Sequence, residues 1–210
     1  MIVKVCGMRE PDNIRAVAQA GADWLGLIFY GRSPRAVAPG DASLYGPVVA
    51  NGQKIRKVGV FVNAGPEEMV ETARVYGLDC LQLHGEEPPE LCDALQRRGL
   101  AVIKAFSVAA PEDLAATASY CGCADYLLFD TKCDGYGGSG RTFDWSILHA
   151  YRGRIPFLLS GGLTPGSLEA VKAFRHPLLA GVDLNSGFET APGVKDTGVL
   201  TEFIKNIKFQ

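Results

Sequence analysis

Two residues that could exchange protons stand at the ends of predicted strands. Cys6 directly follows the apolar run "IVKV" (2–5), and Asp130 directly follows "YLLF" (126–129). In isolation, such a cysteine is typical of core packing and such an aspartate of a helix or turn cap. A thiol and a carboxyl that face one cavity are instead a candidate general base and general acid. A base role requires the thiolate, so we expect the site to lower the pKa of Cys6, and the apolar run predicts a buried Asp130.

Small residues follow the last two predicted strands. The stretch "LLSGGLTP" contains Gly161 and Gly162, and "VDLNSGFE" contains Ser186 and Gly187. Turns of this kind let backbone N–H groups approach an anion, although either one alone is also typical of an ordinary glycine turn. Two of them on neighbouring strands favour a phosphate site, and the nearby "GGSG" adds backbone from Gly138 and Gly140 that could close over a ligand.

Three further polar residues stand at or beyond strand ends. The planar guanidinium of Arg35 in "GRSPRAV" could bind a carboxylate of the substrate. Without such a ligand, Arg35 would be a solvated loop cation. His84 in "LQLHGEE" is more typical of a hydrogen-bonded structural residue than of a catalyst. Asp183 in "AGVDL" ends the last predicted strand, so it joins the same group.

The elements that must bring these residues together alternate regularly along the chain. Eight short β-branched or apolar runs predict strands at 2–5, 24–29, 57–62, 80–83, 101–106, 126–129, 156–160 and 180–184. Pro or acidic residues mark helix starts at "EPDN", "GPEE", "EPPE", "APED", "TPGS" and "VKDT". Eight strands with eight candidate helices predict a (β/α)₈ barrel, whose sites lie at the carboxyl ends of its strands. A doubly wound open sheet is the alternative, but no GxGxxG follows the first strand.

Composition narrows the class of protein. The 210 residues are 47% hydrophobic and 21% charged, which predicts one soluble domain over residues 1–210. The net charge is −2 and the Lys and Arg residues are scattered, so we expect no positive surface that would attract nucleic acid or anionic lipid. No apolar run approaches the ~20 residues of a membrane span. The six cysteines lack CxxC spacing, which predicts reduced thiols in the cytoplasm. Cys121, Cys123 and Cys133 could form a metal site with a histidine, but structural zinc sites space their cysteines differently, so we expect no metal.

These motifs, taken together, resemble one enzyme family. The stretches "KVCG", "FVN", "LQLHGEE", "DTK...GGSGRTFDW", "LSGGLTP" and "GVDLNSGFE...PGVKD" occur in this order over nearly the whole chain. In that order they resemble the phosphoribosylanthranilate isomerases of tryptophan biosynthesis. The resemblance implies a (β/α)₈ barrel that performs an Amadori rearrangement on a small phosphosugar, without a cofactor, as a monomer or homodimer.

The resemblance also implies roles for individual residues. Cys6 is similar to the general base of the family and Asp130 to its general acid. Arg35 falls where the family holds the anthranilate carboxylate, and Asp183 is similar to an acid that orients the substrate. The turns at 161–162 and 186–187 match the phosphate loops of the family.

The chain departs from the family pattern at a few positions, and two rival functions remain open. Asn185 stands where the family commonly has Ser, while Met8 and Phe129 replace commoner aliphatic residues. A histidine-pathway isomerase performs the same rearrangement on another aminoaldose, but its base is an aspartate, so Cys6 argues against it. A non-catalytic phosphosugar-binding module would need the phosphate turns and Arg35 but would have no use for a Cys6 and Asp130 pair.

Overall fold

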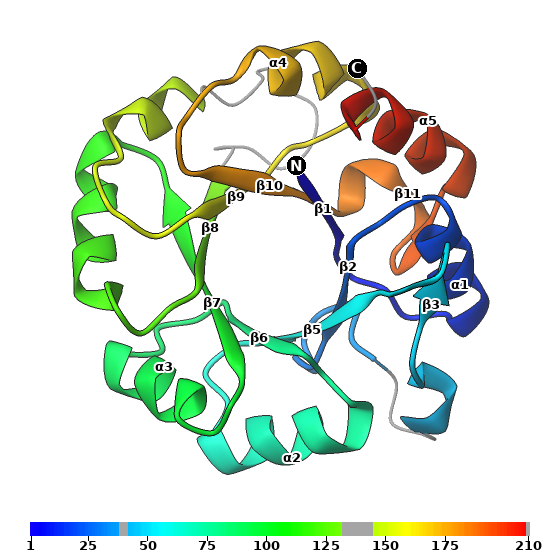
Figure 1. The fold of residues 1–210 in the computed structure, drawn as a ribbon, viewed down its shortest axis with the longest axis horizontal. Coiled ribbons are helices and arrows are strands. Elements are labelled where there is room, and N and C mark those ends of the chain that lie inside the picture. Colours follow the sequence, from blue (N-terminus) through cyan, green and yellow to red (C-terminus); the bar gives the residue numbers. More distant parts are fainter. Residues whose placement is uncertain (38–41, 132–144, 209–210) are drawn as a thin grey trace.

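Eight parallel strands close into a barrel, with helices around its outside (Figure 1). The computed structural model describes residues 1–37, 42–131 and 145–208. Around the barrel the strand order is β1-β10-β9-β8-β7-β6-β5-β2. Their bounds are Ile2–Val5 (β1), Trp24–Ile28 (β2), Arg56–Phe61 (β5), Cys80–Leu83 (β6), Ala101–Val108 (β7), Tyr126–Thr131 (β8), Phe157–Ser160 (β9) and Leu179–Leu184 (β10). All eight predicted strands are confirmed, with boundaries that shift by at most two residues, and the predicted (β/α)₈ barrel is confirmed.

Every helix start marked in the sequence begins a helical element. The α-helices are Pro11–Gln19 (α1), Pro66–Tyr76 (α2), Pro89–Gln96 (α3), Leu168–Ala173 (α4) and Thr197–Lys208 (α5). The 3₁₀ segments are Ala42–Tyr45 (η1), Pro111–Tyr120 (η2), Trp145–Ala150 (η3), Pro165–Ser167 (η4) and Ser186–Phe188 (η5). Proline opens many of these elements because its fixed φ suits the first helical position and its missing N–H has no partner there.

Within the described residues, three of the barrel's connections hold only 3₁₀ helix, a type that the sequence does not distinguish from α-helix. In η2, the hydroxyls of Thr117 and Ser119 donate to carbonyls three residues earlier, a local bond that competes with α-helix hydrogen bonding. After β2, the chain forms η1 and then a hairpin of β3 (Val49–Ala50) and β4 (Gln53–Lys54). Its turn is Asn51-Gly52, both at positive φ, as a tight hairpin requires.

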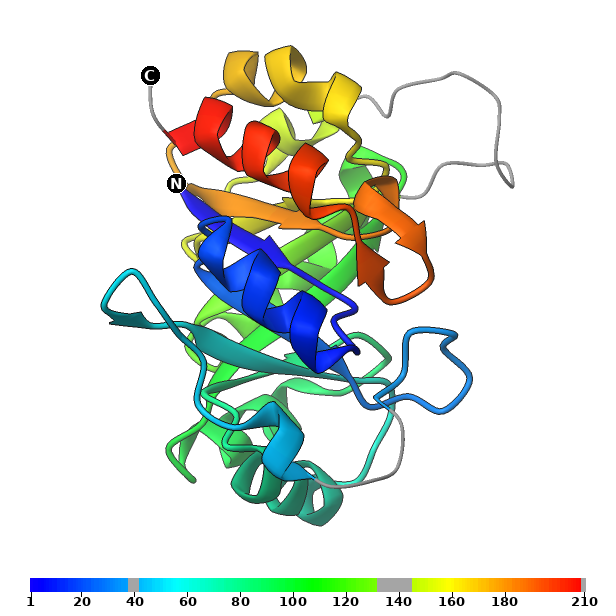
Figure 2. The same cartoon turned by 90° about the vertical axis from the view of Figure 1, so that its right-hand side faces the viewer.

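Three aspartates fix the register at the amino ends of the strands. Asp23, Asp79 and Asp125 each precede a strand, and each accepts the backbone N–H of the neighbouring strand at 2.7 to 2.9 Å. The carboxyl ends of the strands therefore meet at one face. Figure 2 shows the barrel from the side, with the β3–β4 hairpin at one end and the short β11–β12 hairpin (Glu189–Ala191 and Val194–Lys195) at the other.

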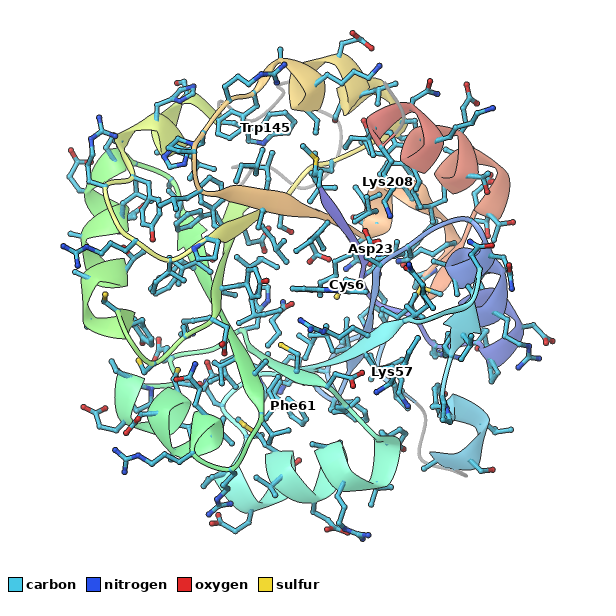
Figure 3. The ribbon with its side chains drawn as sticks, viewed as in Figure 1. Cys6, Asp23, Lys57, Phe61, Trp145 and Lys208 are labelled. Carbon is cyan, nitrogen blue, oxygen red and sulfur yellow. The ribbon has the colours of Figure 1, made fainter. Side chains whose placement is uncertain are left out.

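The barrel interior changes from apolar to polar along its axis. A layer near the amino ends of the strands is packed with Trp24, Val58, Cys80, Ile103, Leu128 and Leu158. Toward the carboxyl ends, buried polar groups appear, among them Lys4, Gln82 and Asp183. In Figure 3, Cys6 lies within the ring of strands, whereas Phe61 and Lys57 lie between the ring and the outer segments. The apolar layer thus supports a polar floor, above which a site can form.

Candidate active site

A cavity of about 230 Å³ opens at the carboxyl ends of the strands. Several of the chemically active residues expected from the sequence reach it from different strands. Its lining consists of Cys6, Ile28, Val60, Gln82, His84, Asp130, Ser160, Gly161, Gly162, Leu163, Asp183, Asn185 and Ser186. Polar groups from several strand ends therefore converge on one space beside a few apolar side chains, the arrangement expected of a small-molecule site.

Cys6 lies at the tip of β1 with only 4% of its surface exposed. It packs against Gly26 of β2, where an added Cβ would lie 2.8 Å from its Sγ, so a glycine is required beside the thiol. Burial raises the pKa of the Cys6 thiol, and the nearby Lys4 ammonium opposes this only in part. The expectation of a lowered thiol pKa is therefore wrong, because desolvation outweighs the cation.

A buried ion pair forms the floor beneath Cys6. Lys4 of β1 and Asp183 of β10 are register partners, and the Lys4 Nζ donates to the Asp183 Oδ1 at 2.8 Å. Both side chains are almost fully buried, at 0% and 5% exposure. Burial alone would lower the pKa of Lys4, but Asp183 and Cys6 beside it raise the pKa overall. Lys4 therefore remains an ammonium in contact with both groups.

Asp130 extends from β8 and meets His84, which follows β6. Its carboxyl is 38% exposed, so the prediction of a buried Asp130 is wrong: at the strand end, the side chain faces the open mouth of the barrel. The His84 Nε2 lies 3.4 Å from the Asp130 Oδ2, and the His84 Nδ1 lies 2.9 Å from the Gln82 Nε2. Since that amide nitrogen donates, Nδ1 accepts and the ring proton is on Nε2, facing Asp130. His84 thus both lines the cavity and orients the carboxyl.

The two small-residue turns lie side by side. Gly161 and Gly162 both have positive φ and line the cavity with Ser186. Gly187 does not line it and instead packs behind, where an added Cβ would lie 2.1 Å from the Leu163 carbonyl oxygen. Gly138 and Gly140 lie outside the described residues, as does Cys133.

Replacing Gly187 with alanine should separate the two turns. Because the new methyl would collide with the backbone of Leu163, we expect a loss of about 1–3 kcal/mol of unfolding free energy and weaker phosphate binding. Urea unfolding and titration with inorganic phosphate would measure both. Gly166→Ala is the matched control, since its Cβ would be 3.7 Å from the nearest atom. Equal behaviour of the two variants would contradict this close packing.

Arg35 is not part of the cavity lining but lies at its edge. Its Cδ would be 2.8 Å from a Cβ added to Gly7, the residue after Cys6. The guanidinium donates to Glu189 of the β11–β12 hairpin, from Nε at 2.9 Å and from Nη2 at 2.7 Å. Arg35 is therefore held by a carboxylate and is not a solvated loop cation.

Several site residues have no counterpart among the sequence predictions. Lys4 stands two positions before Cys6, and strand alternation could have placed both on the inner face. Gln82 stands two positions before His84 in the same way. The partner that Glu189 binds in the loop after β2, Arg35, is 154 positions away. Lys195 meets Glu189 and Asn185 through the short β11–β12 hairpin, which the strand patterns do not predict.

Within residues 1–37, 42–131 and 145–208, no group of three or more His, Cys, Asp or Glu side chains is placed to hold a metal ion. In the same part of the chain, no helix has the length and apolarity needed to cross a membrane.

The sequence and fold are similar to those of known proteins along their whole length. A family model described as N-(5'phosphoribosyl)anthranilate (PRA) isomerase matches residues 3–206. The N-(5'-phosphoribosyl)anthranilate isomerase of Parabacteroides distasonis is 54% identical over 211 residues, covering 99% of this chain and 93% of the relative. The crystal structure of phosphoribosyl anthranilate isomerase from Thermotoga maritima matches with a TM-score of 0.87 and 39% identity, covering 100% of both chains. A phosphoribosyl anthranilate isomerase in complex with reduced 1-(o-carboxyphenylamino)-1-deoxyribulose 5-phosphate matches with a TM-score of 0.85 and 35% identity, also over 100% of both chains.

Proposed function

Because this chain belongs to the N-(5'-phosphoribosyl)anthranilate isomerase family, we propose that it converts N-(5-phosphoribosyl)anthranilate to 1-(o-carboxyphenylamino)-1-deoxyribulose 5-phosphate by acid and base catalysis. As a member of that family it is an isomerase of tryptophan biosynthesis. The proposal rests chiefly on one observation, the presence of Cys6, Asp130 and the two small-residue turns around a single cavity.

Asp130 is the proposed general acid. It enters in the protonated form and gives its proton to the ribose ring oxygen, while the bond from that oxygen to carbon 1 breaks. The anilino nitrogen supplies the electron pair that forms a carbon–nitrogen double bond, which gives the Schiff base. The Nε2–H of His84 beside Asp130 would then stabilise the carboxylate that remains.

Cys6 is the proposed general base. Its thiolate removes the proton from carbon 2 of the Schiff base, and the electron pair moves to the nitrogen to give an enolamine. The enolamine then ketonises to the product. Since β10 and β9 separate β1 from β8 around the barrel, Cys6 and Asp130 reach a bound sugar from different sides. These steps are catalysed by proton transfers and involve no net oxidation or reduction, so the proposal includes neither a metal nor a cofactor.

The remaining residues are proposed to bind the substrate. Asp183 and His84 line the cavity where the sugar hydroxyls would lie. The backbone N–H groups around Gly161, Gly162, Ser186 and Gly187 would hold the phosphate, with Gly138 and Gly140 as further candidates. Arg35 would bind the anthranilate carboxylate.

Domain organisation, cellular compartment and oligomeric state are also part of the proposal. We propose that residues 1–210 act as one domain, since β1 pairs with β10 to close the barrel from both ends of the chain. The described cysteines are free thiols, which supports a reducing, cytoplasmic compartment. The partner is a small phosphosugar, with no role for nucleic acid or membrane. The protein would act as a monomer or a homodimer, and the Thermotoga maritima enzyme is described as dimeric.

The decay of anthranilate fluorescence tests the proposed reaction directly. Purified protein is mixed with freshly made phosphoribosylanthranilate, and the decay is compared with the spontaneous breakdown of the substrate. Fast decay with formation of the deoxyribulose product is the expected result. If decay stays at the spontaneous rate while the protein still binds the phosphosugar, a non-catalytic binding module is the correct description.

Replacing Arg35 with alanine should mainly raise KM. A carboxylate contact made in both the ground state and the transition state changes KM more than kcat. Hydrogen bonds to charged groups contribute ~1.5–3 kcal/mol, so we expect KM to rise about 10- to 100-fold. Steady-state kinetics would measure this, with Arg32→Ala as the control, because Arg32 is exposed in the same loop. An unchanged KM would remove Arg35 from substrate binding.

A further inference from the structure

A buried cluster of charged side chains lies beside the cavity, outside its lining. The β11–β12 hairpin brings Glu189 and Lys195 against Arg35 from the loop after β2. The exposed fractions of these side chains are only 22% for Arg35, 5% for Glu189 and 0% for Lys195. Figure 2 shows this hairpin at the end of the barrel opposite the β3–β4 hairpin. The cluster thus lies at the face that carries the site.

Glu189 holds both cations at once. One of its oxygens accepts from the Lys195 Nζ at 2.5 Å and from the Gly193 backbone N–H at 3.1 Å. The other accepts from the Arg35 Nη2 at 2.7 Å, and both lie 2.9 Å from the Arg35 Nε. Burial alone would raise the pKa of Glu189, but the bonds from Arg35 and Lys195 lower it overall. Glu189 is therefore a carboxylate fixed between two donors.

These bonds use only one edge of the Arg35 guanidinium. A guanidinium has five N–H donors in a rigid plane, and Glu189 meets the edge formed by Nε and Nη2. The end edge, formed by Nη1 and the second N–H of Nη2, takes no part in the contact with Glu189. That end edge is the one that pairs with a second carboxylate in a bidentate manner.

The cluster also carries an excess positive charge next to the base. Two cations share the single Glu189 carboxylate, which leaves a net charge of +1. Lys195 also donates to the Asn185 Oδ1 at 2.8 Å. That oxygen and the Arg35 Cδ both pack against Gly7, at 2.7 and 2.8 Å from where its Cβ would be. Arg35 is thus anchored at the residue that follows Cys6.

We propose that Glu189, braced by Lys195, is a positioning residue that sets the preference of the site for a carboxylated aromatic amine. It holds Arg35 by the Nε–Nη2 edge, keeps clear of the end edge, and leaves one positive charge for the carboxylate of the substrate. Because the side chain of Arg35 is ordered before the substrate arrives, less conformational freedom is lost on binding. This inference rests on the proposed function, since it assigns a specificity role within the same site.

Replacing Glu189 with glutamine tests the proposal. We expect the Kd for reduced 1-(o-carboxyphenylamino)-1-deoxyribulose 5-phosphate to rise about tenfold, a change of ~1.4 kcal/mol. The Kd for the same compound without the carboxyl group should change less than about twofold, because that ligand does not use Arg35. Isothermal titration calorimetry measures both, and steady-state kinetics should show a higher KM with kcat within about threefold.

Two further variants separate positioning from a general loss of structure. In an Arg35→Ala background, Glu189→Gln should have almost no further effect on Kd, since Glu189 acts through Arg35. If Glu189→Gln leaves Lys195 unpaired and does not fold, the double variant with Lys195→Met removes the orphan charge and should show the same selective tenfold loss. Glu71→Gln is the matched control, because Glu71 binds Arg74 through the same edge on the surface of α2.

The outcomes distinguish this inference from the proposed function. Equal weakening of both ligands would overturn it and leave Glu189 a structural residue. An unchanged Kd would also overturn it, and tighter binding of the carboxylated ligand would show that Glu189 competes for Arg35. A wild-type protein that neither binds these ligands nor accelerates the fluorescence decay would overturn the proposed function itself.

Discussion

Replacing Cys6 with serine is expected to lower kcat by about 10²–10⁴-fold, the contribution of a well-placed general base. A serine hydroxyl has nearly the same size, so the cavity keeps its shape, but the hydroxyl gives up its proton far less readily than a thiol. Binding of the reduced product analogue should therefore persist. Asp130→Asn should have an effect of similar size on kcat, because the amide cannot donate an acidic proton to the ring oxygen.

The pH dependence of kcat/KM should report the ionisation of the buried Cys6 thiol. Burial raises the pKa of Cys6, so the thiolate fraction, and with it kcat/KM, should increase as the pH rises through that pKa. The rate of alkylation by iodoacetamide should increase over the same pH range, because the thiolate is the nucleophile. A kcat/KM that falls over this range while the alkylation rate rises would contradict Cys6 as the base.

A second buried cysteine provides the control for these measurements. Cys80 lies within the same barrel, but in the apolar layer, where burial raises its pKa to about 12. Cys80→Ala should keep kcat within about threefold, since the thiol does not line the cavity. Near-normal turnover by Cys6→Ser, measured by the fluorescence decay, would remove Cys6 from the mechanism.

The strands were predictable because their local signals agree with the fold. Each is a short β-branched or apolar run, as parallel strands buried on both faces require, and several are bounded by Asp or Pro, such as β6 by Asp79, β8 by Asp125 and β9 by Pro156. The β3–β4 hairpin was missed although Asn51-Gly52 is a strong turn signal, because its strands have only two residues each. The starts of η2 and η4 were predictable, but their 3₁₀ type was not, because hydroxyl-to-carbonyl bonds such as that of Thr117 depend on local geometry.

The composition of the cavity was predictable in part. Parallel strands end at one face, so Cys6, His84, Asp130 and Asp183 could be placed together from their positions alone. The residues that bond to the site residues could not be predicted in this way. The bond from Arg35 to Glu189 spans 154 positions of sequence, and the direction of the Cys6 pKa shift depends on burial and on a neighbouring ion pair.

Removing only one partner of the ion pair beneath Cys6 should strongly lower the free energy of unfolding. Lys4→Met would leave the Asp183 carboxylate buried without its cation, and breaking a buried pair in this way typically costs ~3–5 kcal/mol. The variant should also raise the pKa of Cys6, because the Lys4 ammonium lowers it, so the rise of kcat/KM should move to higher pH. Urea unfolding and the pH profile measure the two effects separately.

A double variant and a surface pair show whether the loss comes from the orphaned charge. Lys4→Met with Asp183→Leu replaces both charges by apolar groups and should recover most of the stability, while activity stays low because Asp183 faces the cavity. Lys172→Met, which breaks the exposed pair with Glu169, should change stability by less than ~1 kcal/mol. Burial raises the pKa of Asp183 and the Lys4 ammonium opposes this rise. If Lys4→Met proves as mild as Lys172→Met, Asp183 therefore takes up a proton once Lys4 is gone, and the buried charge is not orphaned.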